Sequence, residues 1–155
     1  MNDVDIQKAM EGGMEIYAKA ANYLKELSED ALCDNGPEEN LPMILPAIVL
    51  KALACEIGLK TLLQIEGNSN EKEHNLNTLY RKVEECHRSE ITQVLLAKMK
   101  KVNENYDEDK LIEDIEKVGK TFVEWRYFYE DSRHARITFL DEFYESIQMI
   151  VHSAM

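Results

Sequence analysis

Apolar residues recur every three or four positions along most of this chain, which is the repeat of an amphipathic helix. In the first such segment they form one stripe, made of Ile6, Met10, Met14, Tyr17, Ala21, Leu24 and Leu27. Gly12 and Gly13 weaken this helix by roughly 1 kcal/mol each, which is consistent with close packing against a neighbour. The segment CDNGPEENLP, residues 33–42, then breaks the pattern and indicates a loop.

A second helix is predicted from near Pro46 to Gly67, because proline suits the first helical position and glycine suits the end. Its sequence, AIVLKALACEIGLKTLLQIEG, is apolar almost all round. A helix without a polar side is buried on every side, so we expect this one to lie at the centre of the fold.

The second half of the chain predicts four further helices. Asn75 can cap a short helix, Ser89 precedes another, a long one covers 111–129, and a final one follows Thr138 and continues to about residue 151. No segment alternates with the period of two that a strand requires. We therefore predict an all-α fold, an up-and-down bundle of four main helices with short additional helices, in a single domain spanning residues 1–155.

The charge of the chain limits its partners. The net charge is −12, which disfavours general nucleic-acid binding because the protein repels phosphates, although a small basic site is compatible with it. Local basic clusters occur at Arg81–Lys82, at Lys98, Lys100 and Lys101, and at Arg133, His134 and Arg136. The simplest interpretation of each cluster is a solvent-exposed helix surface.

Several features predict a cytoplasmic protein without a membrane segment. The three cysteines, at positions 33, 55 and 86, have no zinc-binding spacing and are expected to be reduced thiols. The N-terminus has no basic and apolar regions of a secretion signal. The most apolar run, LPMILPAIVL, is about half the roughly 20 residues that span a bilayer. We also expect no cofactor and no metal, since no phosphate-binding loop or carboxylate–histidine metal motif is present.

Glu56 and Lys60 are charged residues in the otherwise apolar second helix. Their spacing of four suits an ion pair within the helix. The pair either lies at the helix edge, where Lys60 extends to water, or is desolvated, with Glu56 reaching a cation on another helix. Arg126, in the aromatic segment WRYFYE, is the cation that we name as a hypothesis.

His74 also has two interpretations. It either orients the turn before Asn75, or joins Lys60 and Arg126 in a polar pocket for an anionic ligand such as a nucleotide or an RNA phosphate. His152, near the C-terminus, is expected to complement the helix dipole.

Three segments together resemble the HEPN superfamily of prokaryotic helical domains. These are LPAIVLKALACEIGLKTLLQIEG, HNLNTLYRKV and FVEWRYFYE, and the resemblance covers roughly residues 40–151. It implies a helical bundle, often a homodimer, found in toxin–antitoxin and phage-defence systems. Many members are metal-independent ribonucleases with an arginine followed, after four to six residues, by a histidine. In such a site histidine transfers protons and arginine stabilises phosphate charge.

The chain departs from that motif. Seven residues separate Arg126 from His134, the pair at the expected late position, so a catalytic role for them requires a loop to absorb the difference. Arg81 and His87 have a permitted spacing but lie in the middle of the chain, where chance can produce it.

Three function hypotheses follow. The first is a HEPN-like binding or assembly module without a standard ribonuclease motif, forming a homodimer and binding an antitoxin or effector protein. The second is a metal-independent ribonuclease toxin or effector that acts on RNA with Arg126 and His134. The third is an acidic helical adaptor that binds a basic protein.

Overall fold

A computed structural model describes residues 2–68, 72–119 and 133–155, with the side chains of the last range described from residue 136. Its elements are α1 (Asp3–Leu32), a 3₁₀ helix η1 (Glu38–Met43), α2 (Ile44–Ile65), α3 (Leu76–Lys82), α4 (Glu85–Val102), α5 (Glu108–Gly119) and α7 (Arg133–Ala154). These residues contain helices and no strand, so the predicted all-α fold is confirmed.

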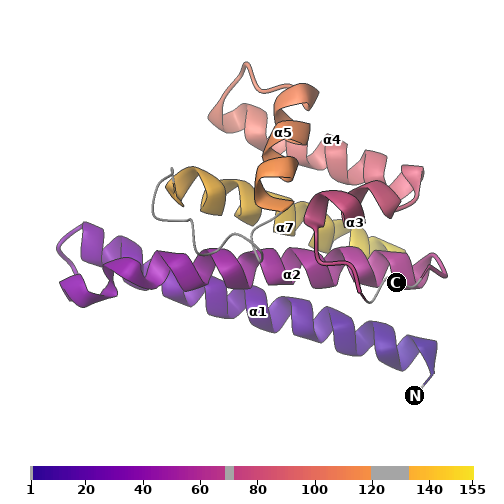
Figure 1. The fold of residues 1–155 in the computed structure, drawn as a ribbon, viewed down its shortest axis with the longest axis horizontal. Helices are drawn as coiled ribbons and strands as arrows, with labels where there is room; N and C mark the ends of the chain where they lie inside the picture. Colours follow the sequence, from indigo (N-terminus) through magenta and orange to yellow (C-terminus); the bar gives the residue numbers. More distant parts are fainter. Residues whose placement is uncertain (1, 69–71, 120–132) are drawn as a thin grey trace.

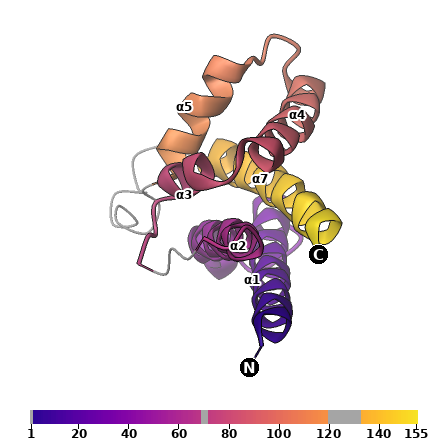
Figure 2. The same ribbon diagram turned by 90° about the vertical axis from the view of Figure 1, so that its right-hand side faces the viewer.

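The helices form two groups. The long helices α1 and α2 lie side by side and α7 packs on α2, while α3, α4 and α5 form a second group in which α3 packs on α2 and α4 packs on α7 (Figure 1). The end-on view shows α2 between α1 and the second group (Figure 2). The two ends of the chain lie at the same end of the molecule (Figures 1 and 2).

The predicted central position of α2 is confirmed, and its packing is closest at Gly58. Cys55, Leu59 and Leu62 are fully buried. A Cβ atom on Gly58 would lie 2.5 Å from Ile147 Cγ2 on α7 and 2.9 Å from Met14 Sδ on α1. Three helices therefore meet at a position where only glycine fits without a shift of its neighbours.

Two predicted helix boundaries are confirmed. Gly67 ends α2 in the left-handed conformation, with φ of 77°, and the amides of Gly67 and Asn68 donate to the carbonyls of Gln64 and Leu63. This is the hydrogen-bond pattern of a Schellman end. The side chain of Asn75 caps α3 by accepting hydrogen bonds from the backbone amides of Asn77 and Thr78.

Other boundaries differ from the prediction. Helix α2 begins at Ile44, so Pro46 lies within its first turn, where a missing N–H is still harmless. Helix α4 begins at Glu85, four residues before Ser89, and α7 begins at Arg133, before Thr138. The long helix predicted over 111–129 is described only as far as Gly119.

One stretch of helix among the described residues, Glu38–Ile65, is long and apolar enough to cross a membrane by length and composition alone. Half of its most apolar window is buried inside the fold. The central helix of a bundle has the same properties, so this stretch is weak evidence for a membrane span.

Candidate functional site

Glu56 is the centre of a buried charged cluster on α2. Its side chain is 5% exposed, and its Oε1 atom lies 2.8 Å from Lys60 Nζ and 2.9 Å from His74 Nδ1. Lys60 is one helical turn further along α2, whereas His74 comes from the segment between α2 and α3. Lys60 and the more exposed His74 therefore share one carboxylate oxygen.

The predicted ion pair between Glu56 and Lys60 is present within α2. The Lys60 side chain is 15% exposed and that of Glu56 5%, so most of the pair is removed from water. Lys60 and His74, predicted to lie together, do converge on Glu56. Arg126, the third member, lies outside the described residues, so its proposed contact with Glu56 stays a prediction.

The predicted catalytic pair also depends on residues that the structure does not describe. Arg126 lies outside the described ranges. The backbone of His134 lies in the first turn of α7, and residues 127–132 before that helix lie outside the described residues, so the loop expected between Arg126 and His134 stays a prediction. Nothing described places these two side chains together.

Arg81 and His87, the pair with permitted spacing, have separate partners. The exposed Arg81 contacts Glu116 of α5 at 3.3 Å. His87 Nδ1 lies 2.7 Å from Oε1 of Glu66, whose side chain is 1% exposed. Glu66 also accepts hydrogen bonds from the amide of Glu84, at the start of α4. His87 therefore helps to hold a buried helix cap, which is a structural role.

A second buried charged cluster joins α1, α2 and α7, and the sequence did not reveal it. Lys51, 3% exposed, lies 2.9 Å from Asp141 Oδ1 and donates a hydrogen bond of 2.6 Å to Asn22 Oδ1. Lys25 donates to Asp141 Oδ2 at 2.7 Å. The buried Oδ1 atom has no partner in hydrogen-bond geometry, so charge alone holds it to Lys51.

The same cluster changes the proton affinity of its neighbours. Burial opposes the charge of Lys25, yet Asp141 outweighs it and the net pKa is raised. Burial, together with the charge of Glu15, raises the pKa of Tyr144 to about 12. Lys51 Nζ lies 5.2 Å from the centre of the Tyr144 ring, close enough for a cation–π contact.

The cluster lies beside a polar cavity of about 550 Å³ lined by α1, α2 and α7. Its cations and carboxylates already pair with one another, because Lys25 and Lys51 both contact Asp141. Their evident effect is to fix the three helices together.

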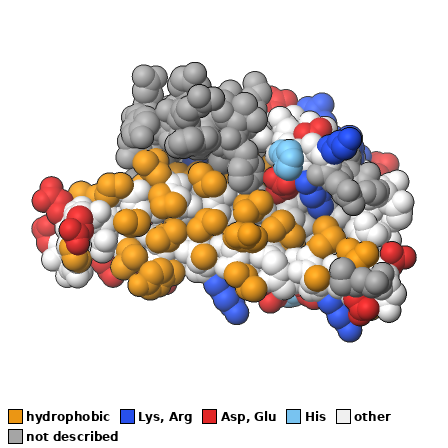
Figure 3. Space-filling model, turned by 60° about the horizontal axis from the view of Figure 1, so that its bottom comes forward, with side chains coloured by type: hydrophobic (Ala, Val, Ile, Leu, Met, Phe, Trp, Pro, Cys, Tyr) orange, Lys and Arg blue, Asp and Glu red, His pale blue; other side chains and the backbone are white. Residues whose placement is uncertain are grey.

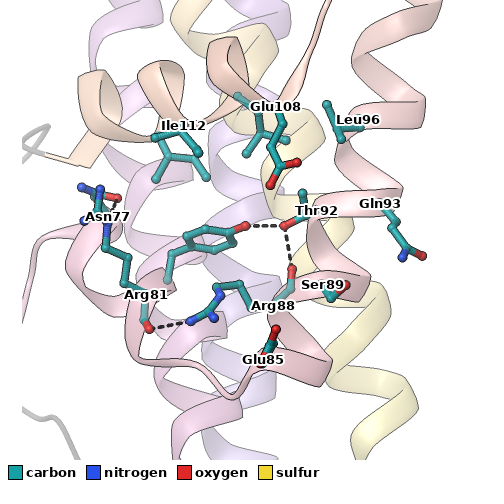
Figure 4. A pocket seen from close by; sticks show the side chains of 13 residues that line it. Asn77, Arg81, Glu85, Arg88, Ser89, Thr92, Gln93, Leu96, Glu108 and Ile112 are labelled. Atoms are coloured by element: carbon teal, nitrogen blue, oxygen red, sulfur yellow. Dashed lines mark hydrogen bonds between the residues drawn. The ribbon is translucent and has the colours of Figure 1, made fainter.

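A further cavity, of about 470 Å³, lies between α3, α4 and α5. Arg88 lines it and donates to the carbonyls of Arg81 and Val83, which end α3 (Figure 4). Tyr80 and Thr92 share a hydrogen bond, and Thr92 donates to the carbonyl of Arg88 (Figure 4). These polar groups hold the turn between α3 and α4, and the cavity also carries acidic side chains.

Three potential metal ligands lie close together at the end of the bundle where both termini lie. His152 Nε2 is 3.0 Å from Glu11 Oε1 and 3.3 Å from Glu15 Oε1. The set has suitable ligand atoms for a divalent cation, but exposed acidic groups beside a histidine are common without one. His152 lies in the last turn of α7, as predicted from the dipole, and it also binds α1.

One face of the described surface is largely apolar. Hydrophobic side chains cover the face that α1 and α2 form together, along most of its length (Figure 3). On α1, Ile16 is 68% exposed and Tyr23 is 63% exposed. On α2, the incompletely buried residues of this face are Pro46, Val49, Leu50, Leu53 and Ile57.

Comparisons with known proteins give no family for the chain: no family model, no curated protein and no solved structure matches it. The resemblance to HEPN domains therefore rests on the quoted segments of the sequence alone and stays a prediction.

Proposed function

We propose that this chain is a HEPN-like helical assembly module of the cytoplasm, which works by binding protein rather than by catalysing a reaction. The apolar face of α1 and α2 is the observation that carries the proposal (Figure 3). Large contiguous apolar surfaces on folded chains mark interaction sites, whereas isolated apolar residues do not.

The charge distribution supports the same conclusion. The chain has 30 acidic residues against 18 basic ones, which disfavours RNA as a general ligand. Lys60 and His74, which could bind an anion, already share the carboxylate of Glu56. The resemblance to HEPN domains supports a role in a toxin–antitoxin or phage-defence system.

The proposal is tested by incubating the purified protein with labelled total RNA in EDTA, beside an Arg126→Ala, His134→Ala double variant. We expect neither protein to cleave the RNA while both remain folded by circular dichroism. Cleavage by the natural sequence that disappears in the double variant would establish a metal-independent ribonuclease and overturn the proposal.

A further inference from the structure

The outer side of α1 carries an apolar strip that follows a seven-residue repeat. The strip consists of Ile6, Ala9, Met10, Gly13, Ile16, Tyr17, Ala20, Tyr23, Leu24 and Leu27. Three positions in each heptad are therefore uncharged, and this holds over three heptads. A strip of this width is what a helix needs to pack against a second helix. We call these residues the outer strip.

The outer strip borders the side by which α1 joins its own bundle, and its residue Leu24 packs against the core. The fully buried side of α1 is centred on Met14, Ala18 and Ala21. Within the outer strip, Ala9, Ile16, Ala20 and Tyr23 are exposed. Helix α1 thus has two apolar sides, and the described residues of the chain bury only one of them fully.

Gly13 provides independent support. A glycine within a helix costs roughly 1 kcal/mol relative to alanine. A Cβ atom on Gly13 would meet no described atom of the chain within 4 Å, whereas the glycine at position 58 is required by contacts inside the bundle. Within the described chain nothing uses the missing side chain of Gly13, so close approach by another molecule would account for it.

Resting on the assembly role proposed above, we infer that the partner on this surface is a second copy of the chain, with the two α1 helices packed antiparallel. A twofold axis near residue 18 places large residues opposite small ones. Tyr23 lies opposite Gly13, Ile16 opposite Ala20, and Leu27 opposite Ala9, since each pair of numbers is symmetric about 18. A parallel pair would instead place Tyr23 against Tyr23 and Gly13 against Gly13.

Charge supports a second copy in this orientation. Two chains that each carry −12 repel each other least when they meet through a surface without acidic residues, and the outer strip is such a surface. Beside the strip, the antiparallel arrangement brings Lys8 of one copy level with the acidic side chains of Glu26 and Asp30 of the other. The outer residues of α2 extend the contact on its other side (Figure 3).

The association is tested by sedimentation equilibrium over a range of concentrations. We expect a reversible dimer of the natural sequence, and an Ile16→Glu, Tyr23→Glu variant should raise its Kd at least about 100-fold, because it buries like charges in the strip. The matched control is Met149→Glu, which adds a charge at an exposed apolar residue, 53% exposed, on α7. That variant should dimerise like the natural sequence.

The orientation is tested by cross-linking in a background with the exposed cysteines replaced, Cys33→Ser and Cys86→Ser. Ala9→Cys and Ala20→Cys each place one thiol on the strip. Around an axis at residue 18, the two copies of position 20 are about 6 Å apart along the helix, and those of position 9 about 27 Å, at 1.5 Å per residue. We expect a short bis-maleimide to cross-link only the Ala20→Cys protein.

The results that would contradict the antiparallel dimer differ from those that would contradict the assembly role. Cross-linking of both cysteine variants, or of Ala9→Cys alone, would overturn the antiparallel arrangement. A chain that sediments as a monomer at every concentration would overturn the second copy as partner. If that monomer also binds an apolar dye more strongly than the Ile16→Glu, Tyr23→Glu variant does, the exposed face and the assembly role remain. RNA cleavage would overturn the assembly role in either case.

Discussion

The two flanks of α1 differ in what they contact. On the flank towards α7, Glu11, Asn22 and Lys25 all have partners on α2 or α7, at 2.6 to 3.0 Å. On the opposite flank the outer strip is apolar, and Ile16 and Tyr23 are mostly exposed. The polar residues therefore connect the helices inside the chain, whereas apolar residues face outwards. A helix arranged in this way is suited to present an apolar surface from a rigid support.

The largest effect is expected from breaking the polar flank. An Asp141→Ala variant removes the partner of Lys25 and of the buried Lys51. Leaving one buried charge unpaired costs about 3 kcal/mol or more, so the free energy of unfolding in urea should fall by that amount. Measurements at one protein concentration keep any contribution from association constant.

The control removes both buried charges together. A Lys51→Met, Asp141→Leu double variant leaves no buried lysine to desolvate, so it should lose much less stability than Asp141→Ala. Equal losses in the two variants would show that the shape of Asp141, and not its charge, holds the helices together.

A second comparison uses two glycines, Gly58 of α2, at the point where α1 and α7 pack closely, and Gly12 of α1, where no described atom is near. Gly58→Ala places a Cβ atom 2.5 Å from Ile147 Cγ2, and such overpacking costs about 1–3 kcal/mol despite the better helix propensity of alanine. Gly12→Ala meets no atom within 4 Å and should stabilise α1 by up to about 1 kcal/mol. Urea unfolding of both variants tests the difference; stabilisation by Gly58→Ala would contradict the close contact of the three helices.

The polar flank also predicts sensitivity to alkali. The raised pKa values of Lys25 and Tyr144 mean that the folded state holds these protons more tightly than the unfolded state. Their stabilisation is complete below the unfolded pKa values, near 10.5 for Lys25 and 10 for Tyr144, and is lost as pH rises through the folded ones. The melting temperature should therefore be steady from pH 7 to 9 and fall above pH 10.

Tyr144→Phe provides the control, because it keeps the ring that lies beside Lys51 and removes the titrating hydroxyl. This variant should show a smaller loss of stability between pH 10 and about pH 12 than the natural sequence. An unchanged pH profile would exclude Tyr144 as a contributor.

The smallest effect is expected beside the outer strip. Lys19 lies between the outer strip and the cavity that α1, α2 and α7 line, and in the antiparallel dimer its two copies lie nearly level with the twofold axis and repel each other. Lys19→Ala should tighten the dimer by only a few-fold, since exposed charge pairs contribute roughly 0–1 kcal/mol. The difference in dimer Kd between Lys19→Ala and the natural sequence should become smaller in high salt. Weaker association of Lys19→Ala would contradict the position of the axis.

The sequence predicted the centre of the fold better than its edges. Helix α2 has no polar side, so its burial followed directly from its composition. The burial of helix α1 was harder to predict, because the helix has two apolar sides and the predicted stripe combined residues from both. Met14 and Ala21 of that stripe are buried, but Tyr17 is 38% exposed.

The candidate site shows a similar division. Glu56 and Lys60 are one helical turn apart, so their ion pair was visible in the sequence, and His74 follows soon afterwards. Lys51 is equally unusual in an apolar helix, but its partner Asp141 is ninety residues away and no local pattern connects the two. The charge of Lys51 within α2 was the only available signal.

The most direct test of the account compares Gly13→Ala with Gly12→Ala by sedimentation equilibrium. Both substitutions add one methyl group to α1, and neither meets a described atom of the chain within 4 Å. If a second α1 helix lies against the outer strip, Gly13→Ala should raise the dimer Kd about tenfold, while Gly12→Ala, beside the strip, should leave it nearly unchanged. Equal dissociation constants for the two variants would contradict close packing of a second copy at Gly13.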